Sequence, residues 1–286
     1  MSVRLVITDA MWDQIEPLMP ADPVRGRRWA DHRRTLEAIA WKYRTNSPWR
    51  DLPDELGSFQ TAHKRLIRWA VDGTWEMILA AVLAAADADD DIDWTVSVDS
   101  TVVRAHQHAA GALKRGRPSR GEPADHAIGR SRGGLSTKVH LAADGRARPL
   151  AFTVTAGQAG DAPAFETVMS RIRVPRRGPG RPRTRPLAVL ADRAYSSRAI
   201  RAHLRRRGIR AVIPQPSDQV GHRLRRGRLG GRPPGFDSEA YKQRNSVERC
   251  INRLKQWRGL ATRTDKLAIA YQAALHLAGI LIWTRP

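Results

Sequence analysis

One segment near the C-terminus places a carboxylate between cations on a helix that must be buried on its other side. Tyr241, Arg244 and Glu248 are three and four residues apart, and Lys255 follows seven residues later, so an α-helix puts all four on one face. A separate apolar stripe anchors this helix: Val247, Cys250, Ile251 and Leu254. Such a face suits a metal ligand that works beside a phosphodiester.

The chain is strongly basic. It has 286 residues with 50 Lys and Arg against 28 Asp and Glu, a net charge of +22. Because 41% of its residues are hydrophobic, it can build a core and is not a disordered basic tail. We expect a nucleic acid partner, since each phosphate neutralised by the protein releases counterions. An anionic membrane is the alternative partner.

The apolar segment Leu267–Trp283 contains Tyr271, Gln272 and His276, so we expect a buried core helix and no membrane span. The single cysteine, Cys250, excludes an intrachain disulfide and a Cys-rich zinc site. Since Met1–Ile7 is too short for a signal peptide, we expect a cytoplasmic, nucleoid-associated protein.

Residues 1–86 have the pattern of a small all-helical domain. Thr8, Asp31 and Ser58 are expected to cap three of its helices, and the third helix is Phe59–Val71. We expect this third helix to expose basic side chains, which favours helix-turn-helix docking in a major groove. A solvated charged face is the alternative. The side chains in question are His63, Lys64, Arg65 and Arg68.

An acidic run, residues 87–93, is interpreted as a solvated linker, and residues 94–286 as a second domain. Two of its predicted strands flank Asp144-Gly145, a typical hairpin turn. Strands come first, then strand–helix–strand, then helices, which favours an α/β fold with a mixed sheet flanked by helices. The predicted strands are Trp94–Val103, Ser136–Ala142, Pro149–Thr155, Leu187–Ala191 and Ala211–Pro214, and the predicted helices are Ser196–Arg207, the Glu248 helix and Leu267–Trp283.

Three segments rich in Arg, Gly and Pro interrupt this domain, and we expect them to be disordered. Two of them carry Gly-Arg-Pro flanked by further basic residues, centred on Arg117 and Arg181. Such a sequence can lie in a narrow minor groove, with generic phosphate contact as the alternative. The segments are Lys114–Gly121, Arg171–Arg185 and Arg223–Gly235.

Two aspartates stand where strands are expected. Asp99 lies within the first strand of the sheet, and Asp192 ends the buried strand at residues 187–191, where open α/β sheets place ligands. Together with Glu248 they would repel one another unless a divalent cation bound them. Two Mg²⁺ ions about 4 Å apart can activate a water or a 3′-OH and stabilise the leaving oxygen. Each residue has an alternative role: Asp99 could cap a strand end, Asp192 could cap the helix at Ser196, and Glu248 could pair with Arg244 or Asn252.

These residues lie in motifs that resemble those of DDE transposases of the insertion-sequence-five superfamily, along essentially the whole chain. The resemblance is carried by Arg27-Arg28-Trp29, residues 44–53, Arg68-Trp69, residues 98–106, 131–140 and 190–195, and residues 244–263. It implies a bacterial enzyme with a ribonuclease H-like core that depends on two Mg²⁺ ions, for which Mn²⁺ can substitute. It also implies recognition of terminal inverted repeats in double-stranded DNA, cleavage and strand transfer into target DNA, and a homodimer in the synaptic complex.

Carried over to this chain, the resemblance makes Asp99, Asp192 and Glu248 the catalytic and metal-binding residues. Tyr241, Arg244 and Lys255 would steady DNA near the scissile phosphate. Asn46 and Ala194 stand where the family usually has glycine, which questions the turn in the helical domain and the geometry beside Asp192.

Other candidate residues are weaker. Asp161 is interpreted as a loop or helix cap, and as the most plausible omission from the catalytic set. His106 and His108 could bind a metal from one side of a strand, and His140 is expected to be packed or to face DNA. A phosphate-binding loop of the Gly-Lys-Ser/Thr kind is absent from the sequence, so ATP dependence is not implied.

Three functions remain open at this point. The first is a transposase. The second is a DNA-binding protein without catalysis, either a repressor derived from a transposase or a nucleoid protein, which would not explain three carboxylates within basic segments. The third is a nuclease that cuts DNA without joining it.

Overall fold

The N-terminal part of the chain is helical, as predicted. The computed structural model describes residues 4–24, 28–114 and 120–285. Thr8 and Asp31 cap their helices as expected, accepting hydrogen bonds from the N–H groups of Met11 and Arg34. Ser58 precedes the third helix, but its hydroxyl donates to Gln60. The helices are α1 (Asp9–Ile15), α2 (His32–Thr45), α3 (Phe59–Val71) and α4 (Thr74–Ala88).

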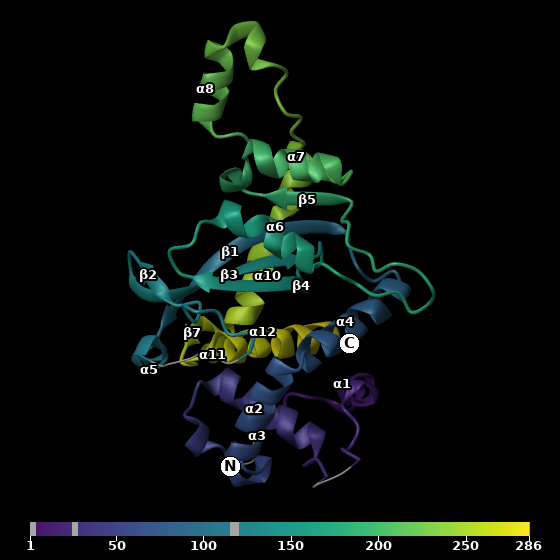
Figure 1. The fold of residues 1–286 in the computed structure, drawn as a ribbon. Coiled ribbons are helices and arrows are strands. Elements are labelled where there is room, and N and C mark those ends of the chain that lie inside the picture. The colour runs from purple at the N-terminus through teal and green to yellow at the C-terminus, as the bar shows by residue number, and fades with distance from the viewer. Residues whose placement is uncertain (1–3, 25–27, 115–119, 286) are drawn as a thin grey trace.

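A mixed sheet forms the centre of the molecule, which confirms the predicted α/β, ribonuclease H-like class (Figure 1). From one edge to the other its main strands follow the order β4, β3, β1, β5 and β6. The first three pair antiparallel, whereas β5 runs parallel to β1 and to β6. The strands are β1 (Thr95–Ala105), β2 (Gly129–Ser131), β3 (Gly134–Ala143), β4 (Pro149–Ala156), β5 (Ala188–Ala191), β6 (Arg210–Val212) and β7 (Thr262–Arg263).

Helices cover both faces of this sheet. Ser97 and Ser100 on β1 point to opposite faces because side chains alternate along a strand. Ser97 bonds Ser246 of α10, and Ser100 bonds Asp161 of α6. The helices of this part are α5 (Gln107–Ala110), α6 (Asp161–Arg171), α7 (Arg198–Arg206), α8 (Ser217–Arg225), α9 (Ser238–Tyr241), α10 (Asn245–Lys255), α11 (Arg258–Ala261) and α12 (Ala268–Trp283).

The C-terminal helix α12 lies between the N-terminal helices and the sheet (Figure 1). All of its residues are buried except Ile269, Gln272 and Ile282, which are half-buried. This confirms the predicted core helix and joins the two halves of the chain in one hydrophobic core. Among the described residues, no single helix has the length and apolar character of a membrane span; α3 and α4 reach it only as a pair bent by 73°.

The turn after α2 explains the asparagine at position 46. Asn46 ends α2 in the left-handed conformation, with φ at 59°, which asparagine tolerates better than most residues. Its side chain accepts a hydrogen bond from Lys42 and donates one to the carbonyl of Thr262. The side chain thus links α2 to β7, a contact that glycine could not make.

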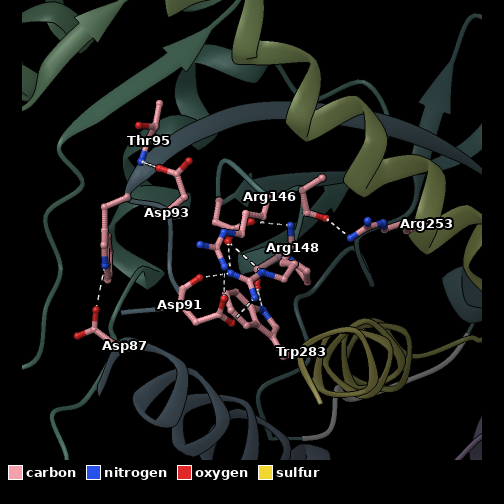
Figure 2. A network of polar contacts seen from close by, with 12 residues as sticks. Asp87, Asp91, Asp93, Thr95, Arg146, Arg148, Arg253 and Trp283 are labelled. Atoms are coloured by element: carbon pink, nitrogen blue, oxygen red, sulfur yellow. Dashed lines mark hydrogen bonds and ion pairs between the residues drawn. The ribbon is translucent and has the colours of Figure 1, made fainter. Parts of the chain in front are cut away.

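Residues 88–90 of the acidic segment are exposed, but Asp87, Asp91 and Asp93 are bonded, so the prediction of a solvated linker is wrong for these three (Figure 2). Asp87 accepts hydrogen bonds from Trp94 and Arg183. Asp91 pairs with Arg146 and, at 2.5 Å, with Arg148. These contacts fix the segment against the sheet, because Arg146 and Arg148 lie in the turn between β3 and β4 and Arg183 lies in the loop before β5.

The Arg- and Gly-rich segments are more structured than expected within the described residues. Val174 and Arg183 form a β-bridge, and the Arg183 guanidinium lies 4.0 Å from the ring centre of Trp94. Helix α8 includes Arg223 and Arg225 and projects away from the sheet (Figure 1). Arg117 lies outside the described residues.

Arg148 should be the most important side chain of the network in Figure 2, because it compensates the fully buried carboxylate of Asp144 at 2.7 Å and stacks 3.8 Å from the ring centre of Trp283. We expect Arg148→Ala to lower the free energy of unfolding by about 3–5 kcal/mol, since it strands a buried charge. Urea denaturation measures this. Arg146→Ala, at an exposed position, is the control and should cost under about 1 kcal/mol.

The effect of Arg148→Ala should also depend on pH. Burial raises the pKa of Asp144, and Arg148 counteracts that rise. Without Arg148 the folded-state pKa rises further, so the protonated carboxyl is favoured in the folded protein. The deficit of the variant should therefore shrink as the pH falls toward the usual carboxyl range and grow as the pH rises. A deficit independent of pH would contradict this assignment.

Candidate active site

The predicted aspartates lie where two parallel strands part. β1 and β5 pair from Thr95 and Ala188 up to Val98 and Ala191. Asp99 is the next residue on β1, and Asp192 is the next residue after β5. Both carboxylates therefore emerge at the carboxyl end of β5, the place where open α/β sheets hold ligands.

Arg244 joins two of the three predicted carboxylates. Its guanidinium donates to Asp99 at 2.5 Å and to Glu248 at 2.6 Å. Asp99 and Arg244 are mostly covered, at 19% and 16% side-chain exposure, whereas Glu248 is 52% exposed. The sheet strand and helix α10 thus bring their carboxylates to a single cation.

Asp192 lies close enough to act electrostatically on the same groups. Burial raises the pKa of Asp99, Arg244 lowers it, and the charge of Asp192 raises it. Burial also raises the pKa of Tyr241, and Asp192, Asp99 and Glu248 all add to that rise. Asp99 and Glu248 therefore meet at Arg244, whereas Asp192 acts on Asp99 and Tyr241 through its charge.

Asp192 does not cap the helix expected to begin at Ser196, because Ser197 caps α7, but it caps the turn before that helix. It accepts a hydrogen bond at 2.9 Å from the N–H of Ala194 in the short 3-10 helix Arg193–Tyr195. Ala194 has no positive φ, so alanine fits this position without backbone strain. The alanine therefore leaves the geometry beside Asp192 intact.

The carboxylate set suits a hard divalent cation, which takes oxygen ligands. Asp99 is half-buried beside like charges, so an added positive charge would stabilise its ionised form. Within residues 4–24, 28–114 and 120–285, however, no three His, Cys, Asp or Glu side chains lie together closely enough to bind one ion. The Arg244 guanidinium lies between Asp99 and Glu248 and supplies the countercharge there.

The predicted helical face of Tyr241, Arg244, Glu248 and Lys255 is built from three successive helical pieces. Tyr241 ends α9, Arg244 ends a 3-10 turn (Lys242–Arg244), and Glu248 and Lys255 belong to α10. The 3-10 turn stacks side chains three residues apart. Lys255 is half-buried, which lowers its pKa, and it lines a small cavity with Thr101 of β1.

The basic residues predicted on α3 divide into two groups. Lys64 and Arg68 are exposed, as expected. Arg65 is 5% exposed, so the prediction that the helix exposes it is wrong. Its guanidinium lies 3.9 Å from the ring centre of Trp29 and contacts His32 at 3.1 Å. In the loop between α6 and β5, Arg181 is exposed.

Asp161 was left out of the predicted catalytic set, yet it lies beside it. It starts α6 and accepts hydrogen bonds from Ser100 at 2.6 Å and Lys138 at 3.1 Å. Burial alone would raise the pKa of Asp161, but these two donors hold it below its usual range. The Tyr195 hydroxyl is buried without a partner in the described part of the chain, and burial and Asp161 raise its pKa. The sequence signalled only a helix cap at Asp161, because the contact with Ser100 is long-range.

The histidines outside this set take other roles. β1 ends before His106, which caps α5, and the ring centres of His106 and His108 are 4.6 Å apart. His140 is buried and contacts the Thr155 hydroxyl at 2.8 Å, so it is the packed histidine that was one of the two expectations.

Comparison with known proteins connects this geometry to a family. A family model described as "Transposase DDE domain" matches residues 91–283, and one described as "Putative transposase of IS4/5 family" matches residues 7–79. The "Putative transposase for insertion sequence element IS402" of Burkholderia cepacia is 32% identical over 168 residues, which are 58% of this chain and 69% of that protein. The "Putative transposase for insertion sequence element IS6501" of Brucella ovis is 29% identical over 151 residues, 53% of this chain and 100% of that protein.

Among solved structures, the "Crystal structure of the Mos1 Strand Transfer Complex" aligns with 85% of this chain and 80% of its own, at 13% identity and a TM-score of 0.27. The strand order of the sheet and the match of residues 91–283 to the family model support the fold, and this alignment adds nothing to them.

Removing the cation between the carboxylates should change Asp99 measurably. We expect Arg244→Gln to raise the pKa of Asp99 further, because Arg244 is the side chain that lowers it. A carbon-detected NMR titration of labelled aspartate measures this. Arg249→Gln, at an exposed position on the same helix, is the matched control, and an unchanged Asp99 pKa in the Arg244 variant would refute the bridging role.

Asp161 should be coupled to Lys138, whose side chain is only 13% exposed. We expect Asp161→Asn to lower the free energy of unfolding by about 1–3 kcal/mol, since it leaves a covered ammonium without its carboxylate. In a double-mutant cycle with Lys138→Gln, the two losses should be less than additive. Glu166→Gln on the exposed side of α6 is the control. Strict additivity would show that the pair does not interact.

Proposed function

This chain belongs to the DDE transposases, enzymes that catalyse DNA cleavage and strand transfer, and we propose that Asp99, Asp192 and Glu248 are its catalytic carboxylates. One observation carries this proposal: a single guanidinium, that of Arg244, binds Asp99 of the sheet and Glu248 of the helix, beside the charge of Asp192. If Asp99 only ended a strand, nothing would require it to share a guanidinium with Glu248, which lies about 150 residues later in the chain.

DDE transposases use divalent metal ions. In this protein the ions would be two Mg²⁺ held by the three carboxylates, and Mn²⁺ would substitute. Bound there, they would activate the attacking water or 3′-OH and stabilise the leaving oxygen. The protein contributes position: β1 and the residue after β5 fix two ligands on a rigid sheet, and α10 fixes the third.

The basic residues around the carboxylates would hold the DNA. Arg244 can turn its fork from the carboxylates to a phosphate oxygen, because guanidinium binds both in the same bidentate way. Tyr241 and Lys255 would contact the strand on either side of Glu248. Farther away, Lys64 and Arg68 on α3, and Arg181 in its loop, would contact double-stranded DNA at the terminal inverted repeats and the target.

Three further parts of the proposal follow from the family. The helical region, residues 1–86, would recognise the repeats, and residues 94–286 would cut and join. Two copies of the chain would bring two element ends together as a homodimer. The protein would act in the bacterial cytoplasm, on the nucleoid.

The decisive experiment uses a supercoiled plasmid that carries the DNA bordering this gene. With Mg²⁺ the wild type should nick the plasmid and yield strand-transfer products. Glu248→Gln should lose nicking by at least about 10³-fold, because a metal ligand acts on the transition state, while DNA binding is retained. Glu239→Gln, an exposed glutamate on α9, is the control and should keep full activity.

The alternatives predict other outcomes. A wild type that binds but never cuts would support a repressor, and cutting without joined products would support a nuclease.

A further inference from the structure

A second concentration of positive charge lies where three helices end. A cavity of about 310 Å³ opens between the C-termini of α2, α10 and α12. Arg44 enters it from the last turn of α2, Arg253 and Gln256 from the end of α10, and Arg285 from the residues after α12. Its remaining described lining residues are apolar, so none is acidic.

The three arginines have no carboxylate partner among the described residues, where no Asp or Glu oxygen lies within 4.0 Å of any of them. Arg253 donates to the backbone carbonyl of Ala147 at 3.2 Å (Figure 2). Glu37 on α2 is influenced by the charge of Arg44, but its oxygens accept hydrogen bonds from two backbone N–H groups. The charge at the cavity is therefore largely uncompensated.

Helix dipoles account for only part of this charge. Basic residues in a last turn commonly complement the negative end of a helix, which is equivalent to about half an elementary charge. Three such ends amount to roughly −1.5, against three full positive charges. An excess of positive charge remains, in a recess that can admit an anion.

The position of the cavity connects it to the catalytic carboxylates. Arg253 and Gln256 follow Glu248 by five and eight residues on the same helix, which is roughly 7.5 and 12 Å along its axis. Asn252, between Glu248 and Arg253, is exposed. Since successive phosphates of one strand rise by about 3.4 Å along the axis of duplex DNA, this span corresponds to about two to four nucleotides of a duplex that lies along α10.

We propose that this cavity binds one phosphodiester of the DNA backbone, two to four nucleotides from the phosphate that is cut at Glu248. The inference rests on the proposed function and adds a contact to it. Guanidinium groups match phosphate oxygens bidentately, and Gln256 adds an amide donor. A base or a free nucleotide fits less well, because the aromatic side chain in the lining, Trp257, is 6% exposed and offers no face for stacking.

The salt dependence of DNA binding tests this proposal without catalysis. The probe is a fluorescent duplex carrying the DNA that borders this gene, in EDTA. One phosphate contact contributes about 0.9 to the slope of log K against log salt concentration. Arg253→Gln should weaken binding and lower that slope by up to about 1. Arg4→Gln, an exposed arginine of the N-terminal segment, is the matched control and should leave the slope unchanged.

The triple variant Arg44→Gln, Arg253→Gln, Arg285→Gln separates one shared site from three independent contacts. If the arginines hold a single phosphate, the slope should fall by about 1 in total, whereas three separate phosphates would lower it by about 3. A fall of about 3, or an equal effect of Arg4→Gln, overturns the proposal. Arg253→Lys, which keeps the charge, should keep most of the slope, and thermal unfolding confirms that each variant folds.

A free anion is the other source of the same chemistry, and inorganic phosphate is the probe for it. Saturable stabilisation of the wild type but not of Arg253→Gln by inorganic phosphate, combined with an unchanged DNA slope, would assign the cavity to a free anion and overturn the DNA assignment.

Once the nick is mapped, neutral methylphosphonate linkages locate the contact. A single linkage two to four nucleotides from the nick should weaken binding by the wild type and not by Arg253→Gln. An effect equal in both proteins, at every position, would refute the contact. If the wild type never nicks, the proposed function fails, whereas the salt slopes still decide on the cavity.

Discussion

The fold depends on a helix that cannot face water on any side. α12 is apolar along nearly its whole length, so both the sheet and the N-terminal helices must pack against it. Its partners arrive early in the chain, through α2, α3 and α4, and in the middle, through β4. The helical region is therefore part of the same core as the sheet, and the elements that carry the three proposed catalytic carboxylates rest on that common core.

In the candidate active site a guanidinium offsets the repulsion between carboxylates. The carboxylates of Asp99, Asp192 and Glu248 carry like charges, which repel one another. Burial adds to the cost of ionising Asp99. Arg244 offsets this by bridging Asp99 and Glu248, while Ser100 and Lys138 stabilise Asp161 on the other face of β1. A divalent cation would compete with a guanidinium for these carboxylates.

Much of this arrangement was predictable from local pattern. The strands around Asp144-Gly145, the Phe59–Val71 helix and the core helix follow from residue periodicity and turn residues, and the structure places them almost as expected. Asp99, Asp192 and Glu248 were identified through motif resemblance; in the structure Arg244 joins Asp99 to Glu248, and Asp192 follows β5, the strand that pairs with the strand of Asp99. Their catalytic and metal-binding roles remain predictions.

The predictions for Arg65, the acidic run and Asp161 were wrong or incomplete for one physical reason. Exposure of Arg65 was judged from its charge, but Trp29 and His32, more than thirty residues earlier, cover it. The acidic run was expected to be solvated, but Arg146, Arg148 and Arg183, which are distant in sequence, pair with it. Asp161 looked like a cap because Ser100 and Lys138 reach it only through the sheet. Local sequence does not show which opposite charge the fold will bring near.

The bonded acidic segment has a mechanical consequence. Asp87 and Asp91 fasten the end of α4 to the sheet, so the chain has no loose tether between its helical half and its catalytic half. If α3 reads a DNA sequence, these contacts help to set the distance between α3 and the carboxylates. The spacing between α3 and the carboxylates would then determine how far from the recognised sequence the DNA is cut.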